Sequence, residues 1–160
     1  MFRLRFLWVG KTQRGFVQEG VEHYLKRIGA FATAECVELR AADHSGRDPE
    51  QALRAEAAAI ERRLTPGEAV IVLDEHGSAL TSPQFSARLA ALRDESGHSL
   101  AFVIGGAHGL DASIQRQARL KLALSAMTLP HQLVRLVLLE QVYRALTLHA
   151  GTPYHHGDRT

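Results

Sequence analysis

The chain is poor in the residues that stabilise small secreted or metal-dependent folds. It has one cysteine, Cys36, in 160 residues, which excludes an internal disulfide and a cysteine-rich zinc site. Aromatic residues make up only 6% of the sequence, and no apolar run approaches the length of a membrane span. A chain of this length can bury a core without disulfides or metals. These absences predict a soluble globular protein of a reducing compartment.

Net charge is also small. Lysine and arginine outnumber aspartate and glutamate by 19 to 17, a formal charge of +2, which is common among enzymes of small molecules. After Asp111, however, basic residues outnumber the two acids Glu140 and Asp158. The basic residues of this C-terminal third are Arg116, Arg119, Lys121, Arg135, Arg144 and Arg159. They could form a basic face that contacts phosphates or simply solvated helix faces, and charge alone leaves both alternatives open.

The N-terminal segment MFRLRFLWVG combines arginines with apolar residues. The two kinds alternate, and neither a long apolar stretch nor a small-residue cleavage site follows, so the pattern does not indicate a signal peptide. It predicts a first strand over Leu4–Val9. We therefore expect a cytoplasmic protein.

Strand and helix patterns alternate along the chain. Short apolar runs typical of strands cover 4–9, 34–39, 69–74, 99–104 and 121–125, with a turn expected at 75–78. Helical spacing or composition covers 16–28, 50–64, 83–93, 113–119 and 132–148, with Ser82 as the candidate cap of the third helix. This alternation predicts an α/β fold with a parallel sheet. No repeat or long linker divides the chain, so 1–160 is expected to form a single domain.

Ligands of open parallel sheets bind beyond the carboxyl ends of the strands, where loops and helix N-termini converge. Three predicted strand ends carry residues suited to this: Leu73–Gly77, Ile104–Gly109 and Leu124–His131. Glycines in the second allow the backbone to approach a ligand closely, although a tight turn with nothing bound requires the same glycines. The spacing matches neither a dinucleotide fingerprint nor a P-loop, so binding of nucleotide phosphates is not expected.

Other catalytic signatures are missing or ambiguous. The nine histidines include no His-Glu-x-x-His pair, so no metal site is expected. Ser125 and Thr128 lack the Gly-x-Ser-x-Gly surroundings of a nucleophile, and their hydroxyls are better suited to bond backbone or ligand. Glu140 and Arg144, four residues apart, form either an ordinary intrahelical ion pair or one partly buried at an interface. The tail 152–156 has residues for base stacking and phosphate contact, although its composition also leaves a disordered end open.

Seven motifs follow one another in a fixed order. They are Leu4-x₄-Val9-Gly10, Ile71-x-Leu73-Asp74-x₂-Gly77, Ile104-Gly-Gly-x₂-Gly109-Leu110, Leu124-Ser-x-Met-Thr-Leu-Pro-His131, Val134-Arg135, Glu140-Gln-x-Tyr143-Arg144-Ala145 and Pro153-Tyr-His155. Together they closely resemble the ribosomal RNA large subunit methyltransferase H (RlmH) family. The resemblance covers essentially the whole chain and extends to its length.

The resemblance implies a SPOUT-type α/β fold with a parallel sheet, helices on both faces and a C-terminal trefoil knot. It implies a homodimer that methylates N3 of a pseudouridine in 23S rRNA on the assembled ribosome, with S-adenosyl-L-methionine as methyl donor. The cofactor contacts that it carries over are Leu73, Gly105, Leu124, Ser125, Ala126, Met127, Thr128 and Leu129. It also places His155, Tyr154 and Arg144 at the methyl-transfer centre. His155 is then the candidate base, and Arg144 the candidate stabiliser of the developing anion.

The chain departs from this family at its end, where Thr152 precedes Pro153 and His156 replaces a basic residue. A neutral histidine weakens any phosphate contact at that position. Two alternatives therefore stay open: a SPOUT methyltransferase with another RNA substrate, and a ribosome-binding protein that has lost methyl transfer. The predicted helix 132–148 has apolar residues on more than one face, which suits either a dimer interface or burial within the monomer.

Overall fold

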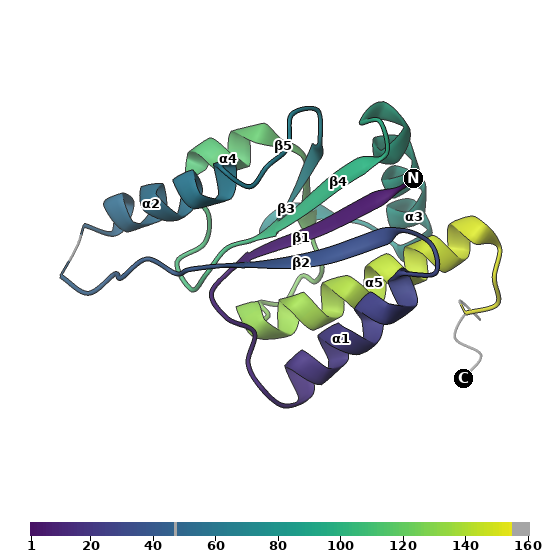
Figure 1. Ribbon diagram of the computed structural model, residues 1–160, viewed down its shortest axis with the longest axis horizontal. Coiled ribbons are helices and arrows are strands. Elements are labelled where there is room, and N and C mark those ends of the chain that lie inside the picture. Colours follow the sequence, from purple (N-terminus) through teal and green to yellow (C-terminus); the bar gives the residue numbers. More distant parts are fainter. Residues whose placement is uncertain (47, 155–160) are drawn as a thin grey trace.

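A computed structural model describes residues 1–46 and 48–154, and shows a parallel sheet with helices on both faces (Figure 1). The strands are β1 (Arg3–Val9), β2 (Thr33–Leu39), β3 (Ala69–Ala79), β4 (Ser99–Ile104) and β5 (Ala118–Ala123). The helices are α1 (Phe16–Ile28), α2 (Pro49–Glu61), α3 (Ser82–Glu95), α4 (Ala112–Gln117) and α5 (His131–Ala150). The predicted α/β class is confirmed. Within the described ranges, no helix is long and apolar enough to cross a membrane.

The sheet has the strand order β2-β1-β4-β3-β5, and all neighbours pair in parallel. The central strands β1 and β4 are buried on both faces, which explains their apolar runs. On one face, Phe6 of β1 stacks on Phe102 of β4 at 5.2 Å between ring centroids and packs in a core with α1, α3 and α5. On the other, Leu7 and Val9 pack against α2 and α4.

The third strand is longer than the sequence indicated. Residues 75–78 are not the predicted turn, because β3 continues to Ala79. Its pairing with β5 is interrupted between Leu73 and Ser78, and such an irregularity redirects side chains locally. Gly77 allows the two backbones to approach, since a Cβ there would lie 2.5 Å from the carbonyl oxygen of Lys121. The interruption stands at the end of the sheet where ligands of parallel folds bind.

Two other predicted boundaries are wrong for local reasons. Ser82 is not the cap of α3, because Thr81 occupies that position and forms a reciprocal pair of bonds with Gln84. The last strand begins at Ala118 rather than Lys121, since Ala118 already pairs with Val70 of β3. The preceding helix α4 ends at Gln117 to allow this.

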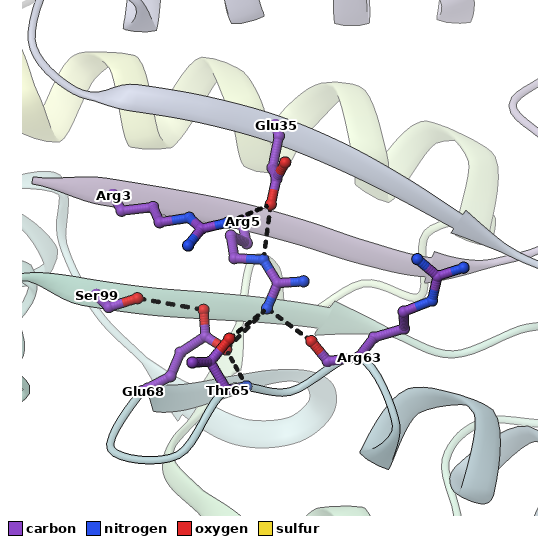
Figure 2. A network of polar contacts seen from close by, with 7 residues as sticks. All are labelled: Arg3, Arg5, Glu35, Arg63, Thr65, Glu68 and Ser99. Carbon is purple, nitrogen blue, oxygen red and sulfur yellow. Dashed lines mark hydrogen bonds and ion pairs between the residues drawn. The ribbon is translucent and has the colours of Figure 1, made fainter.

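A polar network closes the amino-terminal end of the sheet (Figure 2). Arg5 of β1 donates to Glu35 of β2 at 2.8 Å and to Glu68, ahead of β3, at 3.0 Å. It also donates to the carbonyl of Arg63 at 2.7 Å, a residue that lies beyond the end of α2 although the predicted helix included it. The side chain of Glu68 is fully buried and accepts from Ser99 of β4 as well. The network joins three strands and the α2–β3 turn, far from the carboxyl ends.

The longest helix, α5, packs against α1 and α3 on one face of the sheet (Figure 1). Gly20 of α1 lies so close to it that a Cβ would be 2.5 Å from a methyl group of Leu136. Leu138 and Val142 are buried in the chain's own core, whereas Leu133 and Val137 stay half-buried. The apolar residues on several faces of this helix are thus only partly explained by packing within one chain.

Candidate functional site

The carboxyl ends of β3, β4 and β5 surround a cavity of about 610 Å³. All three loops that the sequence singled out contribute to its wall, as the argument from parallel strands predicted. The lining residues are Leu73, Asp74, Glu75, His76, Ile104, Gly105, Gly106, Ala107, His108, Gly109, Leu110, Gln115, Leu122, Leu124, Ser125, Met127, Leu129, Pro130, His131 and Val134. A cavity of this size accommodates a ligand the size of a nucleoside derivative.

Most of the predicted cofactor residues line this cavity. They are Leu73, Gly105, Leu124, Ser125, Met127 and Leu129. Ala126 and Thr128 belong to the same loop but are not among the lining residues. Thr128 instead donates its hydroxyl to Glu75 at 2.9 Å, and the Ser125 hydroxyl accepts from the main-chain N–H of Met127 at 2.9 Å. These bonds give the loop 124–130 a defined shape and connect it to the end of β3.

The glycines of the loop 105–109 are partly required by the tight turn that the loop makes. A Cβ on Gly105 would collide with the carbonyl of Gly109. Gly109 has a φ of +79° and donates its N–H to the carbonyl of Gly106 at 3.1 Å. A tight turn therefore accounts for these glycines, and the turn forms one wall of the cavity.

His131 begins α5 and lines the cavity. Burial, and to a smaller extent the nearby Arg135, hold the pKa of its imidazole below the ordinary value of 6.5. The ring is therefore neutral at pH 7. It presents the cavity with a polar but uncharged side chain.

Arg135 does not belong to a basic surface, so this part of the sequence-based interpretation is wrong. Its side chain is completely buried and donates to the carbonyls of Val9 at 2.8 Å and Gly10 at 3.2 Å. Its guanidinium also lies 5.1 Å from the Trp8 ring centroid, and burial lowers its pKa. Arg135 thus joins α5 to the end of β1. The exposed cations of the C-terminal third include Arg116, Arg119 and Lys121.

Two of the predicted catalytic residues, Arg144 and Tyr154, lie together. Glu140 accepts from Arg144 at 2.7 Å and from the Tyr154 hydroxyl at 3.4 Å. The Tyr154 ring packs edge-on against Tyr143, 4.7 Å between centroids. We call Glu140, Tyr143, Arg144 and Tyr154 the tail cluster. The third predicted residue, His155, lies outside the described residues.

Burial, followed by the contact with Tyr24, raises the pKa of Tyr154 to about 12. Its hydroxyl therefore stays protonated near neutral pH. It can donate a hydrogen bond but does not accept a proton from a substrate.

The tail cluster and the cavity of one chain are separate. Val134 is the last α5 residue on the cavity wall, and Arg144 follows it by ten residues, a rise of about 15 Å along the helix. Neither Arg144 nor Tyr154 is among the described residues that line the cavity. Within residues 1–46 and 48–154, the chain therefore does not bring Arg144 and Tyr154 together with its predicted cofactor residues.

The predicted cofactor contacts did not include Asp74, Glu75 and His131, which line the cavity. All three belong to loops that the sequence singled out, and their place beside the predicted contacts was the available signal. Glu56 bonds His44, whose ring stacks on His108 of the glycine loop, and both residues lie far from that loop in sequence. No sequence pattern indicated their position.

Comparison with known proteins identifies the family. A family model described as a predicted SPOUT methyltransferase matches residues 2–155. Ribosomal RNA large subunit methyltransferase H of Geobacter sulfurreducens is 43% identical over 154 residues, covering 96% of this chain and 99% of that protein. The chain belongs to the RlmH family. Ribosomal RNA large subunit methyltransferase H of Desulfovibrio desulfuricans is 44% identical over 153 residues, covering 96% of this chain and 97% of that protein.

Membership in the RlmH family confirms the resemblance on which the sequence interpretation rested. A solved structure of a probable methyltransferase from Bordetella pertussis Tohama I aligns with a TM-score of 0.57 and 15% identity, covering 91% of this chain and 96% of that one. That likeness shows a shared fold. The RlmH family consists of S-adenosylmethionine-dependent methyltransferases.

The cavity has the chemistry that this methyl donor requires. Leu73, Ile104 and Leu124 provide an apolar wall suited to adenine, beside main-chain groups of the glycine loop. Asp74 and Glu75 add carboxylates to the wall, which attract a sulfonium cation. Volume, apolar residues and acidic residues thus all fit.

Proposed function

We propose that this protein methylates N3 of a pseudouridine in 23S rRNA on the assembled ribosome, in the cytoplasm, as a knotted single-domain protein of residues 1–160. The observation that carries the proposal is the convergence of three family-specific loops on one cavity, whose wall includes the acidic residues Asp74 and Glu75. RlmH relatives match this chain over nearly its whole length. A protein that only binds ribosomes has no need of such a cavity.

The cavity residues would hold the methyl donor. Bound S-adenosylmethionine supplies a methyl group activated by its positive sulfonium. Leu73, Leu124 and Leu129 would contact the adenine, and the loops of Gly105 and Ser125 would provide main-chain donors and acceptors. Methyl transfer is an in-line displacement, so orientation of the two reactants is the main contribution of the protein.

The tail supplies the groups that act on the RNA base. The N3 proton of the uracil ring must leave as the new N–C bond forms, and His155 is the proposed base. Arg144 stabilises the negative charge that develops on the ring. Tyr154, whose high pKa keeps it protonated, donates a hydrogen bond or stacks on the base and does not take the proton.

The protein acts as a homodimer in this proposal, because one chain separates its tail cluster from its cavity. Leu133, Val137 and the ion pair Glu140–Arg144 occupy neighbouring turns of α5 and are all half-buried. Such a stripe, apolar at one end and paired at the other, suits contact with a second copy. The tail of each chain then acts at the cavity of the other chain.

The test of cofactor binding uses titration calorimetry on the purified chain with S-adenosylmethionine. Leu129→Arg places a cation in the cavity that opposes the sulfonium, so affinity falls by at least tenfold. Ala55→Arg, on an exposed position of α2, adds the same charge elsewhere and leaves binding unchanged.

Wild-type protein that binds no S-adenosylmethionine contradicts the proposal and favours the alternative of a ribosome-binding protein without activity. Binding without methylation of ribosomes favours a SPOUT methyltransferase with another RNA substrate. The altered tail around Thr152 and His156 is the sequence feature behind this second alternative.

A further inference from the structure

The glycine loop of the cavity has a single side chain by which the protein can hold it. Residues 105–109 read Gly-Gly-Ala-His-Gly, so His108 alone extends beyond a methyl group. Glycine-rich backbone loses much conformational freedom when it becomes ordered. The contact between Gly106 and Gly109 closes the turn, but it does not attach the turn to the rest of the fold.

His108 stacks on His44, which belongs to the loop between β2 and α2. The ring centroids are 4.0 Å apart and the planes differ by 27°. His44 Nε2 lies 2.9 Å from Oε1 of Glu56 on α2, whose side chain is only 5% exposed. The N–H of Ala42 donates to the same oxygen at 3.3 Å. A buried carboxylate fixes the tautomer and the orientation of an imidazole, so His44 is a rigid platform for His108.

The same contacts reach the cavity wall. His108 lines the cavity, and a Cβ on Gly106 would lie 4.0 Å from Oε2 of Glu56 and 3.4 Å from Val9. The contacts from Glu56 to His44 and from His44 to His108 thus connect the buried face of α2 with the cavity. In the described part of the chain no three side chains form a group that could hold a metal ion, so a metal centre does not explain this arrangement.

We infer that Glu56 and His44 are positioning residues, which hold His108 and through it the loop 105–109 in the shape that binds the methyl donor. The inference rests on the proposed function, since it concerns the same cavity. Without the stack the loop visits other conformations, and the fraction of molecules competent to bind falls. The interaction of two rings changes such a fraction by about three- to tenfold.

Titration calorimetry with S-adenosylmethionine tests this on the full chain. His44→Ala and His108→Ala each weaken binding by about three- to tenfold. The double variant weakens it no further than either single one, because both remove the same contact. His108→Phe keeps a ring on His44 and restores the wild-type Kd. His98→Asn, at the opposite end of β4, is the control and leaves the Kd unchanged.

Two further readouts separate positioning from general damage. Turnover at saturating cofactor stays near the wild-type rate while the KM for cofactor rises. Hydrogen exchange of the amides of 105–109 becomes faster in His44→Ala and Glu56→Gln, whereas exchange in β1 and β4 does not change.

An unchanged Kd in His44→Ala, additive losses in the double variant, or failure of His108→Phe to restore binding overturns the inference. The last of these results would mean that His108 contacts the ligand itself. If the wild-type chain binds no S-adenosylmethionine, the proposed function fails instead. The exchange rates of the loop then still decide whether the stack holds it.

Discussion

The environment of single ionisable groups sets several properties of this protein. Arg135 is fully buried, with main-chain carbonyls of the β1 end and the face of Trp8 as its surroundings. His131 is held neutral near it, and Tyr154 is held protonated at the other end of α5. Sequence alone left Arg135 on either a basic face or a solvated helix face, because the type of residue does not reveal which polar atoms lie opposite it after folding.

Cys36 is expected to be unreactive in the folded protein. Burial, reinforced by Glu38, raises the pKa of its thiol to about 12, and the thiolate is the reactive form. Ellman's reagent at pH 8 should therefore react with it at least tenfold more slowly in the native protein than in guanidinium chloride. Equal rates in the two conditions would contradict this.

His131 should make stability depend on pH. Its pKa is lower in the folded chain than the unfolded value of 6.5, so between these values the unfolded chain binds more protons and stability rises with pH. The loss of stability begins as pH falls through 6.5 and reaches its full size below the pKa of His131 in the folded chain. Urea unfolding at pH 7 and pH 5 measures it, and His131→Gln should reduce the difference. If the stability difference between pH 7 and pH 5 is the same in the variant, groups other than His131 cause it.

At the scale of elements, periodicity predicted strands and helices well and their ends less well. The apolar run 69–74 indicated a buried strand, but β3 continues through 75–79 because β5 pairs with this segment again at Ser78 and Ala79. Thr81 and Ser82 are both good cap residues, and the reciprocal bond with Gln84 selects Thr81. Such choices depend on partners that a single sequence does not show.

The network at the amino end of the sheet predicts unequal effects for its two kinds of ion pair. Glu68→Ala removes one of the two carboxylates that bond the buried Arg5, the one at 3.0 Å, and should lower the free energy of unfolding by about 1.5–3 kcal/mol. Arg3→Ala removes an exposed pair with Glu35 and should lower it by less than about 1 kcal/mol. Urea denaturation of both variants measures the difference. Similar values would show that burial does not set the strength of this network.

At the scale of the whole molecule, the sequence predicted the three loops of the cavity but not the separation of the tail from it. Parallel strands bring their carboxyl ends to one edge of the sheet, so the meeting of 73–77, 104–109 and 124–131 followed from the pattern. The direction of α5 is a tertiary property, and it carries Arg144 away from the cavity of its own chain. That geometry is the reason for proposing a shared site.

A heterodimer with two differently damaged chains tests whether the site is shared. One chain carries Leu129→Arg in the cavity and the other Arg144→Met in the tail. If the tail serves the partner's cavity, the purified heterodimer has one intact site out of two and about half of wild-type activity. Homodimers of either variant should be inactive, and the Arg144→Met homodimer should still bind cofactor. An inactive heterodimer would place tail and cavity of the same chain together.

The most direct measurement is transfer of labelled methyl groups from S-adenosylmethionine to whole ribosomes from a strain that lacks this protein, followed by mass mapping of the labelled nucleotide. We expect label on N3 of one pseudouridine in 23S rRNA, and no label with the Leu129→Arg variant. Label on a different nucleotide, or none from a wild-type protein that binds the cofactor, would contradict this expectation.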